Sequence, residues 1–157
     1  MMELEEKLGE LLRGKALSMG TAESCTGGRI ACRITSVAGS SEYFLGSVVS
    51  YSNKVKHNLL GVSETDLERY GAVSRPVVEQ MAEGAIRVLG CDCSVATSGI
   101  AGPGGGSIDK PVGTVWIAAA LKEQTVSRCF YFKGNRKENI EQSATAALQM
   151  LLELLEK

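Results

Sequence analysis

The chain has 157 residues, of which 44% are hydrophobic and 22% charged, and its formal net charge at pH 7 is -1. This length fits a single domain, spanning residues 1–157, with a full hydrophobic core. The balanced charge gives no basic surface for nucleic acid. No apolar segment approaches the roughly 20 residues needed to cross a membrane.

The cysteines and the N-terminus indicate where the protein resides. Five cysteines occur without the spacing of a disulfide framework, and the N-terminus is too charged for a signal peptide. Reduced thiols in the cytoplasm are therefore expected, with Cys32, Cys91, Cys93 and Cys129 serving in packing. Cys91 and Cys93 are too close in sequence for the usual zinc pair, so no metal is expected.

Hydrophobic periodicity predicts alternating helices and strands in the first hundred residues. In chain order we expect a helix up to about residue 13, ended by Gly14, a strand over 15–22, a helix over 27–36, a strand over 43–51, short helices over 54–60 and 64–70, a longer helix opened by 74–76, and a strand over 93–98.

The last third of the chain has a different order. A glycine-rich loop over 99–107 precedes two strands, 113–121 and 125–133, which we expect to pair antiparallel, and a final helix follows residues 134–136. Strands that alternate with helices, then a hairpin and a helix, predict an α/β fold. We expect a three-layer α/β/α sandwich with a mixed, mostly parallel central sheet.

Residues 21–28 (TAESCTGG) form the predicted corner between the first strand and the following helix. Such a corner exposes small polar side chains and directs backbone N–H groups toward one point. Ser24 and Cys25, both potential nucleophiles, lie at its apex. Ser24 could equally be a helix cap and Cys25 a packing residue.

A serine nucleophile needs a base, and two neighbouring residues are candidates. His57 is the only histidine of the chain. Lys56 could act instead if burial lowered its pKa, because an ordinary lysine is protonated at neutral pH. On a helix the two side chains differ by roughly 100°, so only one can face the site squarely. Either could also be a plain surface residue.

Two later segments are candidates for binding a phosphate. The glycines of 99–107 allow backbone N–H groups to approach a ligand closely. The loop is not a P-loop, because no Gly-Lys-Ser/Thr follows it. Arg136, next to Asn135 at the start of the last helix, could hold a phosphate or lie in solvent.

Six segments taken together resemble one known family. They are 21–28 (TAESCTGG), 37–41 (VAGSS), 51–53 (YSN), 71–74 (GAVS), 98–105 (SGIAGPGG) and 110–115 (KPVGTV). In this order they resemble the CinA C-terminal domain family over essentially the whole chain. The chain looks like the stand-alone form, without the N-terminal domain of full-length members.

The resemblance implies an amidohydrolase that converts nicotinamide mononucleotide to nicotinate mononucleotide and ammonia, in pyridine-nucleotide (NAD) recycling. It implies a serine–lysine dyad of Ser24 and Lys56, with no metal and no cofactor. The other pocket residues that it implies, together with the turn and glycine-loop residues expected to bind substrate, are Thr26, Gly27, Ser41, Tyr51, Ser98, Gly99 and Arg136. Many relatives carry Asp where this chain has Asn135, a residue that either caps the helix or orients Arg136.

Two other readings of the sequence stay open. One is a non-catalytic nucleotide-binding or regulatory module of the same fold. The other is a cysteine hydrolase that uses Cys25. The expected partner is a small pyridine mononucleotide, without nucleic acid or membrane, and a homo-oligomer is left open.

Overall fold

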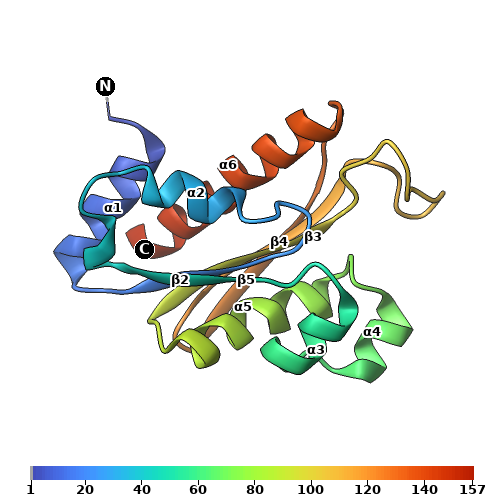
Figure 1. Cartoon of the computed structure of the whole chain (residues 1–157), viewed down its shortest axis with the longest axis horizontal. Coiled ribbons are helices and arrows are strands. Elements are labelled where there is room, and N and C mark those ends of the chain that lie inside the picture. The colour runs from blue at the N-terminus through green and yellow to red at the C-terminus, as the bar shows by residue number, and fades with distance from the viewer. Residues whose placement is uncertain (1) are drawn as a thin grey trace.

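The computed structural model describes residues 2–157 and contains a five-stranded sheet in the order β2-β1-β3-β4-β5 (Figure 1). Strand β1 is parallel to β2 and β3, whereas β4 is antiparallel to β3 and to β5. All strands except β4 therefore run in the same direction. This confirms the predicted mixed, mostly parallel sheet.

The helices and strands follow the predicted order. They are α1 (Leu4–Lys15), β1 (Met19–Glu23), α2 (Arg29–Thr35), the 3-10 helix η1 (Ser40–Glu42), β2 (Phe44–Val49), α3 (Asn53–Leu60), α4 (Glu64–Tyr70), α5 (Arg75–Leu89), β3 (Cys93–Gly99), β4 (Thr114–Leu121), β5 (Gln124–Tyr131) and α6 (Arg136–Glu156).

Helices cover both faces of the sheet and give the predicted three layers. In Figure 1, α1, α2 and α6 lie on one face, and α3, α4 and α5 lie on the other. The side chains of β4 point alternately to the two faces of the sheet, and each face has its own hydrophobic core. In β4, Val115, Ile117 and Ala119 pack toward α6, whereas Ala118 and Ala120 pack toward α5.

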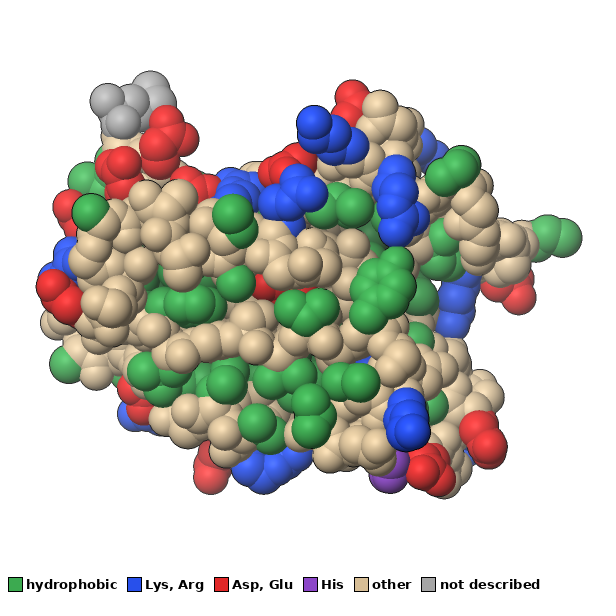
Figure 2. Space-filling view, viewed as in Figure 1, with side chains coloured by type: hydrophobic (Ala, Val, Ile, Leu, Met, Phe, Trp, Pro, Cys, Tyr) green, Lys and Arg blue, Asp and Glu red, His purple; other side chains and the backbone are tan. Residues whose placement is uncertain are grey.

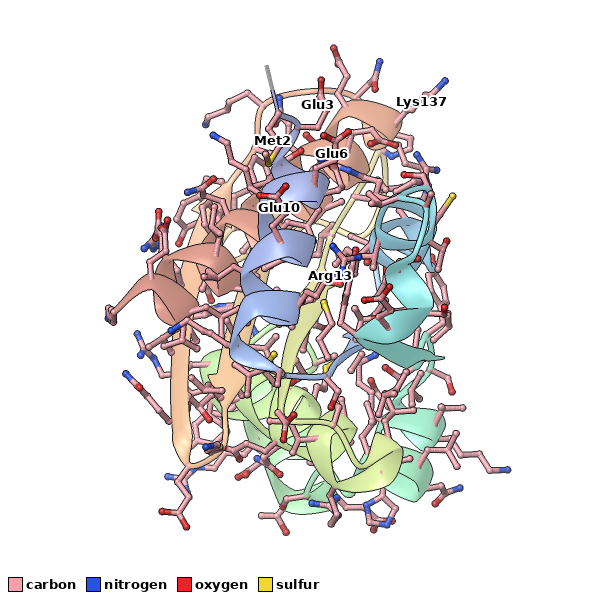
Figure 3. All side chains as sticks on the ribbon, turned by 90° about the vertical axis from the view of Figure 1, so that its left-hand side faces the viewer. Met2, Glu3, Glu6, Glu10, Arg13 and Lys137 are labelled. Carbon is pink, nitrogen blue, oxygen red and sulfur yellow. The ribbon has the colours of Figure 1, made fainter. Side chains whose placement is uncertain are left out.

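Helix α1 is amphipathic, as its leucine spacing predicts. Leu8 and Leu12 are buried, while the outer side carries charged residues, among them Glu6, Glu10 and Arg13 (Figure 3). The predicted end at Gly14 is wrong by two residues. The helix ends instead at Lys15 and is capped by Ala16, whose left-handed φ of 55° lets its amide bond to the carbonyls of the last turn.

This later end of α1 also shortens the first strand, predicted over 15–22. Strand β1 begins only at Met19, because the chain must first leave the helix. All five of its residues are buried, since the sheet is covered on both faces.

Among residues 2–157 no helix is long and apolar enough to span a membrane. All five cysteines are free thiols. Cys91 and Cys93 are buried, as expected of packing residues. Cys32 is exposed, so the expectation that it serves in packing is wrong.

Candidate active site

The site lies where the parallel strands end. Glu23, the last residue of β1, is paired with Val49 on β2 and with Thr97 on β3. The next residue of each chain segment is a serine: Ser24, Ser50 and Ser98 respectively. Ligands gather at the carboxyl ends of parallel strands, and the register brings three serines together there.

Ser24 is held at the apex of the turn between β1 and α2. Its amide donates to the carbonyl of Thr97 at 3.0 Å, and its side chain is buried. Two glycines complete the turn, Gly27 and Gly28, with φ of 56° and 99° that other residues rarely adopt. The N-cap of α2 is Gly28, so Ser24 is not a helix cap.

Lys56 reaches the same point from α3, a helix capped by the Ser52 hydroxyl. Its Nζ lies 3.0 Å from Oγ of Ser24, 2.9 Å from the carbonyl oxygen of Ser50 and 3.3 Å from that of Tyr51. The side chain is only 1% exposed. Burial lowers the pKa of Lys56 from 10.5 to about 8, because the charged form has lost its water.

His57 faces away from Ser24, as the helical spacing requires. Its Nδ1 lies 2.7 Å from the carbonyl oxygen of Val62, and its Nε2 lies 3.1 Å from a carboxylate oxygen of Glu64. This single histidine is seen on the outer surface in Figure 2 (purple), beside acidic side chains. The geometry favours Lys56 over His57 as the neighbour of Ser24.

Cys25 borders the site but is a poor nucleophile. Burial raises the pKa of its thiol from 9.0 to about 12. The thiolate is the reactive form, so Cys25 stays unreactive at neutral pH.

A cavity of about 290 Å³ opens over Ser24 and Lys56. Its walls come from the corner after β1, the start of α3, the segment before α5, the loop after β3 and the start of α6. The lining residues are Ser24, Cys25, Tyr51, Asn53, Lys56, Ala72, Val73, Ser98, Gly99, Ile100, Ala101, Gly102, Gly104, Gly105 and Arg136.

Arg136 spans the cavity from the first turn of α6. Its guanidinium donates to the carbonyl oxygen of Gly102 at 2.7 Å and to the hydroxyl of Tyr51 at 3.1 Å. These contacts place a cation beside the glycine-rich loop. Residue 135 takes no part in them.

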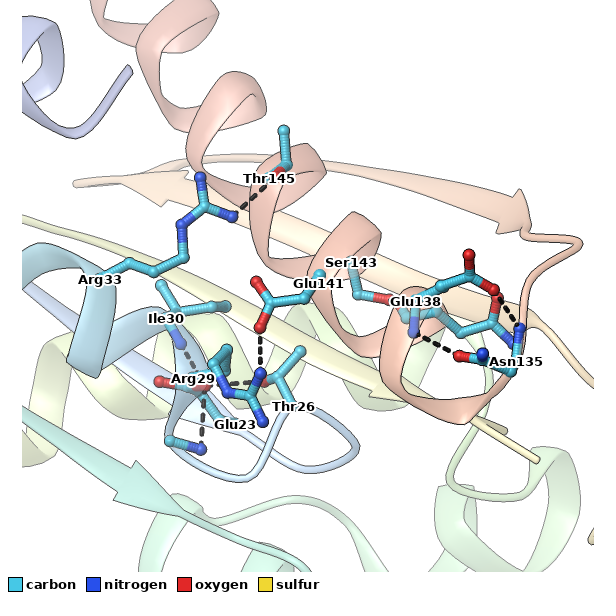
Figure 4. Close-up of polar contacts among 12 residues, drawn as sticks. Glu23, Thr26, Arg29, Ile30, Arg33, Asn135, Glu138, Glu141, Ser143 and Thr145 are labelled. Atoms are coloured by element: carbon cyan, nitrogen blue, oxygen red, sulfur yellow. Dashed lines mark hydrogen bonds and ion pairs between the residues drawn. The ribbon is translucent and has the colours of Figure 1, made fainter. Parts of the chain in front are cut away.

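Asn135 caps α6. Its side chain accepts from the amide of Glu138, and the Glu138 carboxylate accepts from the amide of Asn135, which forms a complete capping box (Figure 4). Asn therefore does the work that Asp would do as a cap. The capping box already uses backbone amides at the N-terminus of α6. The positive group that remains there to bind an anion is the guanidinium of Arg136.

The cavity unites most of the predicted site residues, namely Ser24, Lys56, Tyr51, Ser98, Gly99 and Arg136. Thr26 and Gly27 do not line it. The Thr26 hydroxyl bonds to Glu23 and Thr97, and the Gly27 amide bonds to the carbonyl of Ser24. Both residues help to build the turn, and a binding role for either stays a prediction.

Ser41 does not reach the cavity either. It is exposed in η1, before the start of β2, whereas the cavity lies beyond the end of that strand. A binding role for Ser41 stays a prediction.

Sequence reasoning placed neither Asn53 nor Glu23 among the binding or catalytic residues. Asn53 lines the cavity from the first turn of α3. Glu23 lies fully buried beneath the turn and bonds to several of its groups. Its position directly before the nucleophile was the one available signal.

Comparisons with known proteins agree with this fold. The family model of the CinA C-terminal domain matches residues 1–155. A nicotinamide-nucleotide amidohydrolase PncC from Enterobacter agglomerans is 49% identical over 96% of this chain and 92% of that protein. A CinA-like protein from Chloroherpeton thalassium is 48% identical over 98% of this chain, which spans only 38% of that longer protein.

A solved structure has the same fold. The crystal structure of a competence-damaged protein (CinA) superfamily protein from Klebsiella pneumoniae matches with a TM-score of 0.94 and 33% identity, covering 98% of this chain and 96% of the other. The buried Ser24–Lys56 contact at the ends of the parallel strands and these matches lead to one assignment. The chain belongs to the CinA C-terminal domain family.

Proposed function

We propose that the chain hydrolyses the carboxamide of nicotinamide mononucleotide to give nicotinate mononucleotide and ammonia. The observation that carries the proposal is the buried contact of 3.0 Å between Lys56 Nζ and Ser24 Oγ at the floor of a cavity. The name of the relatives, nicotinamide-nucleotide amidohydrolase, supports the choice of substrate.

Neutral Lys56 begins the reaction. With two N–H groups donated to the carbonyl oxygens of Ser50 and Tyr51, its lone pair is left to face the Ser24 hydroxyl. Lys56 takes the hydroxyl proton as Ser24 Oγ attacks the carboxamide carbon. The C–N bond then breaks, and protonated Lys56 gives its proton to the departing nitrogen, which leaves as ammonia.

Water completes the cycle. The acyl group is now an ester of Ser24, and neutral Lys56 takes a proton from water as its oxygen attacks the ester carbon. Ser24 leaves with that proton, and nicotinate mononucleotide is released. No metal or cofactor enters this scheme.

The opposite end of the substrate carries a phosphate, for which Arg136 is the proposed partner. Guanidinium binds phosphate through paired, charge-assisted hydrogen bonds. Phosphate would replace the neutral acceptors that Arg136 now uses, the Gly102 carbonyl and the Tyr51 hydroxyl. A cavity of about 290 Å³ lies just below the roughly 300–1,000 Å³ typical of small-molecule sites, which suits a small ligand such as a mononucleotide.

The deciding experiment is ammonia release from nicotinamide mononucleotide by the wild type, Ser24→Ala and Lys56→Ala. Turnover should fall by at least about 10³-fold in each variant, because nucleophile and base act as one unit. Undiminished turnover in either variant would contradict the dyad. Calorimetric binding of the mononucleotide without ammonia release from wild type would favour the alternative, a non-catalytic binding module.

A cytoplasmic location and a role in pyridine-nucleotide recycling go with this proposal. Five free thiols suit a reducing compartment. The proposed product retains its ribose and phosphate, so it can re-enter nucleotide synthesis directly.

A further inference from the structure

Glu23 is a fully buried carboxylate directly before the nucleophile. It is 0% exposed, and no Lys or Arg side chain pairs with it among residues 2–157. A buried charge is costly unless hydrogen bonds compensate it. Its compensation comes from the turn and helix that follow it.

The donors to Glu23 are three hydroxyls and three backbone amides. The hydroxyls are those of Thr26, at 2.7 Å, Thr21, at 3.0 Å, and Ser47, at 3.5 Å. The amides belong to Gly28, Ile30 and Ala31, at 3.1, 3.0 and 2.9 Å. Figure 4 shows the contacts of Thr26 and Ile30 with Glu23. Since the N-cap residue Gly28 has no side chain, Glu23 does the work of a cap for α2.

This contact changes which amides are free near Ser24. The N-terminus of a helix commonly binds an anion, but the start of α2 already binds the carboxylate of Glu23. The amides of Gly27 and Arg29 bond to the carbonyls of Ser24 and Thr26. Within residues 2–157, the amides of Cys25 and Thr26 have no such partner.

We propose that Glu23 is a positioning residue for the reaction. By occupying the start of α2 and holding Thr26, it fixes Ser24 against Lys56 and leaves the amide of Cys25, which lines the cavity, free to bind the oxyanion. This inference rests on the proposed function, since it assigns the groups that stabilise the same transition state.

Thr26 links this arrangement to the neighbouring strand. Its hydroxyl donates to Glu23 and lies 2.8 Å from the hydroxyl of Thr97, the residue before Ser98. The turn is thus tied to the strand that forms another wall of the cavity. Loss of either Glu23 or Thr26 should loosen the same turn.

The test uses Glu23→Gln, which keeps the shape but turns an NH₂ group toward amide donors. We expect kcat for nicotinamide mononucleotide to fall about 10- to 100-fold with KM within about threefold, because misplacement by about 1 Å costs on this order. Thr26→Val should show a smaller fall of the same kind. The double variant should lose less than the product of the two single losses.

Two controls separate positioning from a general loss of stability. Leu8→Ala, in the core far from the site, should lower Tm without lowering kcat at a temperature where it stays folded. Glu42→Gln, an exposed carboxylate bonded to Arg13, should leave kcat unchanged. A kcat in folded Glu23→Gln and Thr26→Val equal to that of wild type would overturn the inference.

A second readout does not depend on the substrate. Labelling of Ser24 by a fluorophosphonate probe, followed by mass spectrometry, should slow at least tenfold in Glu23→Gln and be absent in Ser24→Ala. Equal labelling rates in wild type and Glu23→Gln would overturn the inference even if turnover is seen.

The labelling also separates the inference from the proposed function. A wild type that is labelled but releases no ammonia would overturn the proposed substrate, and slower labelling of Glu23→Gln would still support the inference. A wild type with neither labelling nor turnover would overturn both.

Discussion

The Nζ atom of Lys56 lies 3.0 Å from Oγ of Ser24, and its other two polar contacts are backbone carbonyl oxygens. No carboxylate pairs with Lys56 among residues 2–157. The cost of burying the ammonium form is therefore not offset by an opposite charge. This is why its pKa falls to about 8. A lysine in this state can accept a proton near neutral pH.

Lys56→Met should abolish turnover and stabilise the fold at pH 7. At that pH Lys56 is charged in the unfolded chain and mostly charged in the folded chain, where a minor neutral fraction can act as the base. The folded chain therefore bears the cost of burying the charge. A pKa lowered from 10.5 to about 8 corresponds to about 3 kcal/mol, from which lost hydrogen bonds must be subtracted. We expect the free energy of unfolding in urea to rise by about 1 kcal/mol or more.

The same linkage sets the pH dependence of stability. Between about pH 8 and 10.5 the unfolded chain binds more protons at this site, so the wild-type free energy of unfolding should gain on that of Lys56→Met as pH rises. A difference between the two proteins that does not change with pH would contradict the lowered pKa.

Cys25→Ala should retain turnover within about threefold of wild type. Burial holds the thiol protonated, with a pKa of about 12, so it supplies no nucleophile at neutral pH. Iodoacetamide should likewise leave the wild type active over an hour at pH 7.5. Loss of activity in Cys25→Ala together with rapid inactivation would instead favour the cysteine hydrolase.

Arg136→Met should raise KM for nicotinamide mononucleotide about 30-fold, which corresponds to about 2 kcal/mol for a charge-assisted contact. Turnover of nicotinamide riboside, which lacks the phosphate, should be unchanged by the substitution. Lys137→Met, the neighbouring residue on the same helix, is the matched control and should leave both substrates unaffected. An equal effect of Arg136→Met on the two substrates would contradict a phosphate contact.

Asn135→Asp should leave KM within about twofold of wild type and add at most about 0.5–1 kcal/mol to stability. Both residues cap well, and the carboxylate interacts favourably with the helix dipole. Asn135→Ala should lose about 1 kcal/mol in thermal or urea unfolding. A large change in KM for Asn135→Asp would mean that residue 135 orients Arg136 after all.

The fold could be predicted from the sequence because its local signals agree with its packing. Ser52, Ser63 and Asn135 each precede a helical pattern, and each accepts a hydrogen bond as an N-cap in the structure. The end of α1 could not be predicted, since a glycine such as Gly14 is the usual stop but the helix runs on to Lys15 and is capped by Ala16. Tertiary packing of Leu12 and Leu17 into the core decides that boundary.

The site could be predicted only in part. Ser24 and Lys56 were open to several readings until their segments were compared with a family. Glu23 was missed because a carboxylate at a strand end is normally solvated, and only the three-dimensional fold shows α2 directing its amides to it. Thr26 and Gly27 were expected to bind substrate because the turn directs its backbone N–H groups toward one point. Their hydrogen bonds within the turn cannot be read from the sequence.

The central claim is that neutral Lys56 activates Ser24, and the pH dependence of kcat/KM for nicotinamide mononucleotide tests it most directly. We predict an acid limb of unit slope that levels off above an apparent pKa of about 8, because protonated Lys56 cannot accept the Ser24 proton. His57→Gln should leave this limb in place. An acid limb near pH 6.5 that disappears in His57→Gln would contradict the account and assign the base to the histidine.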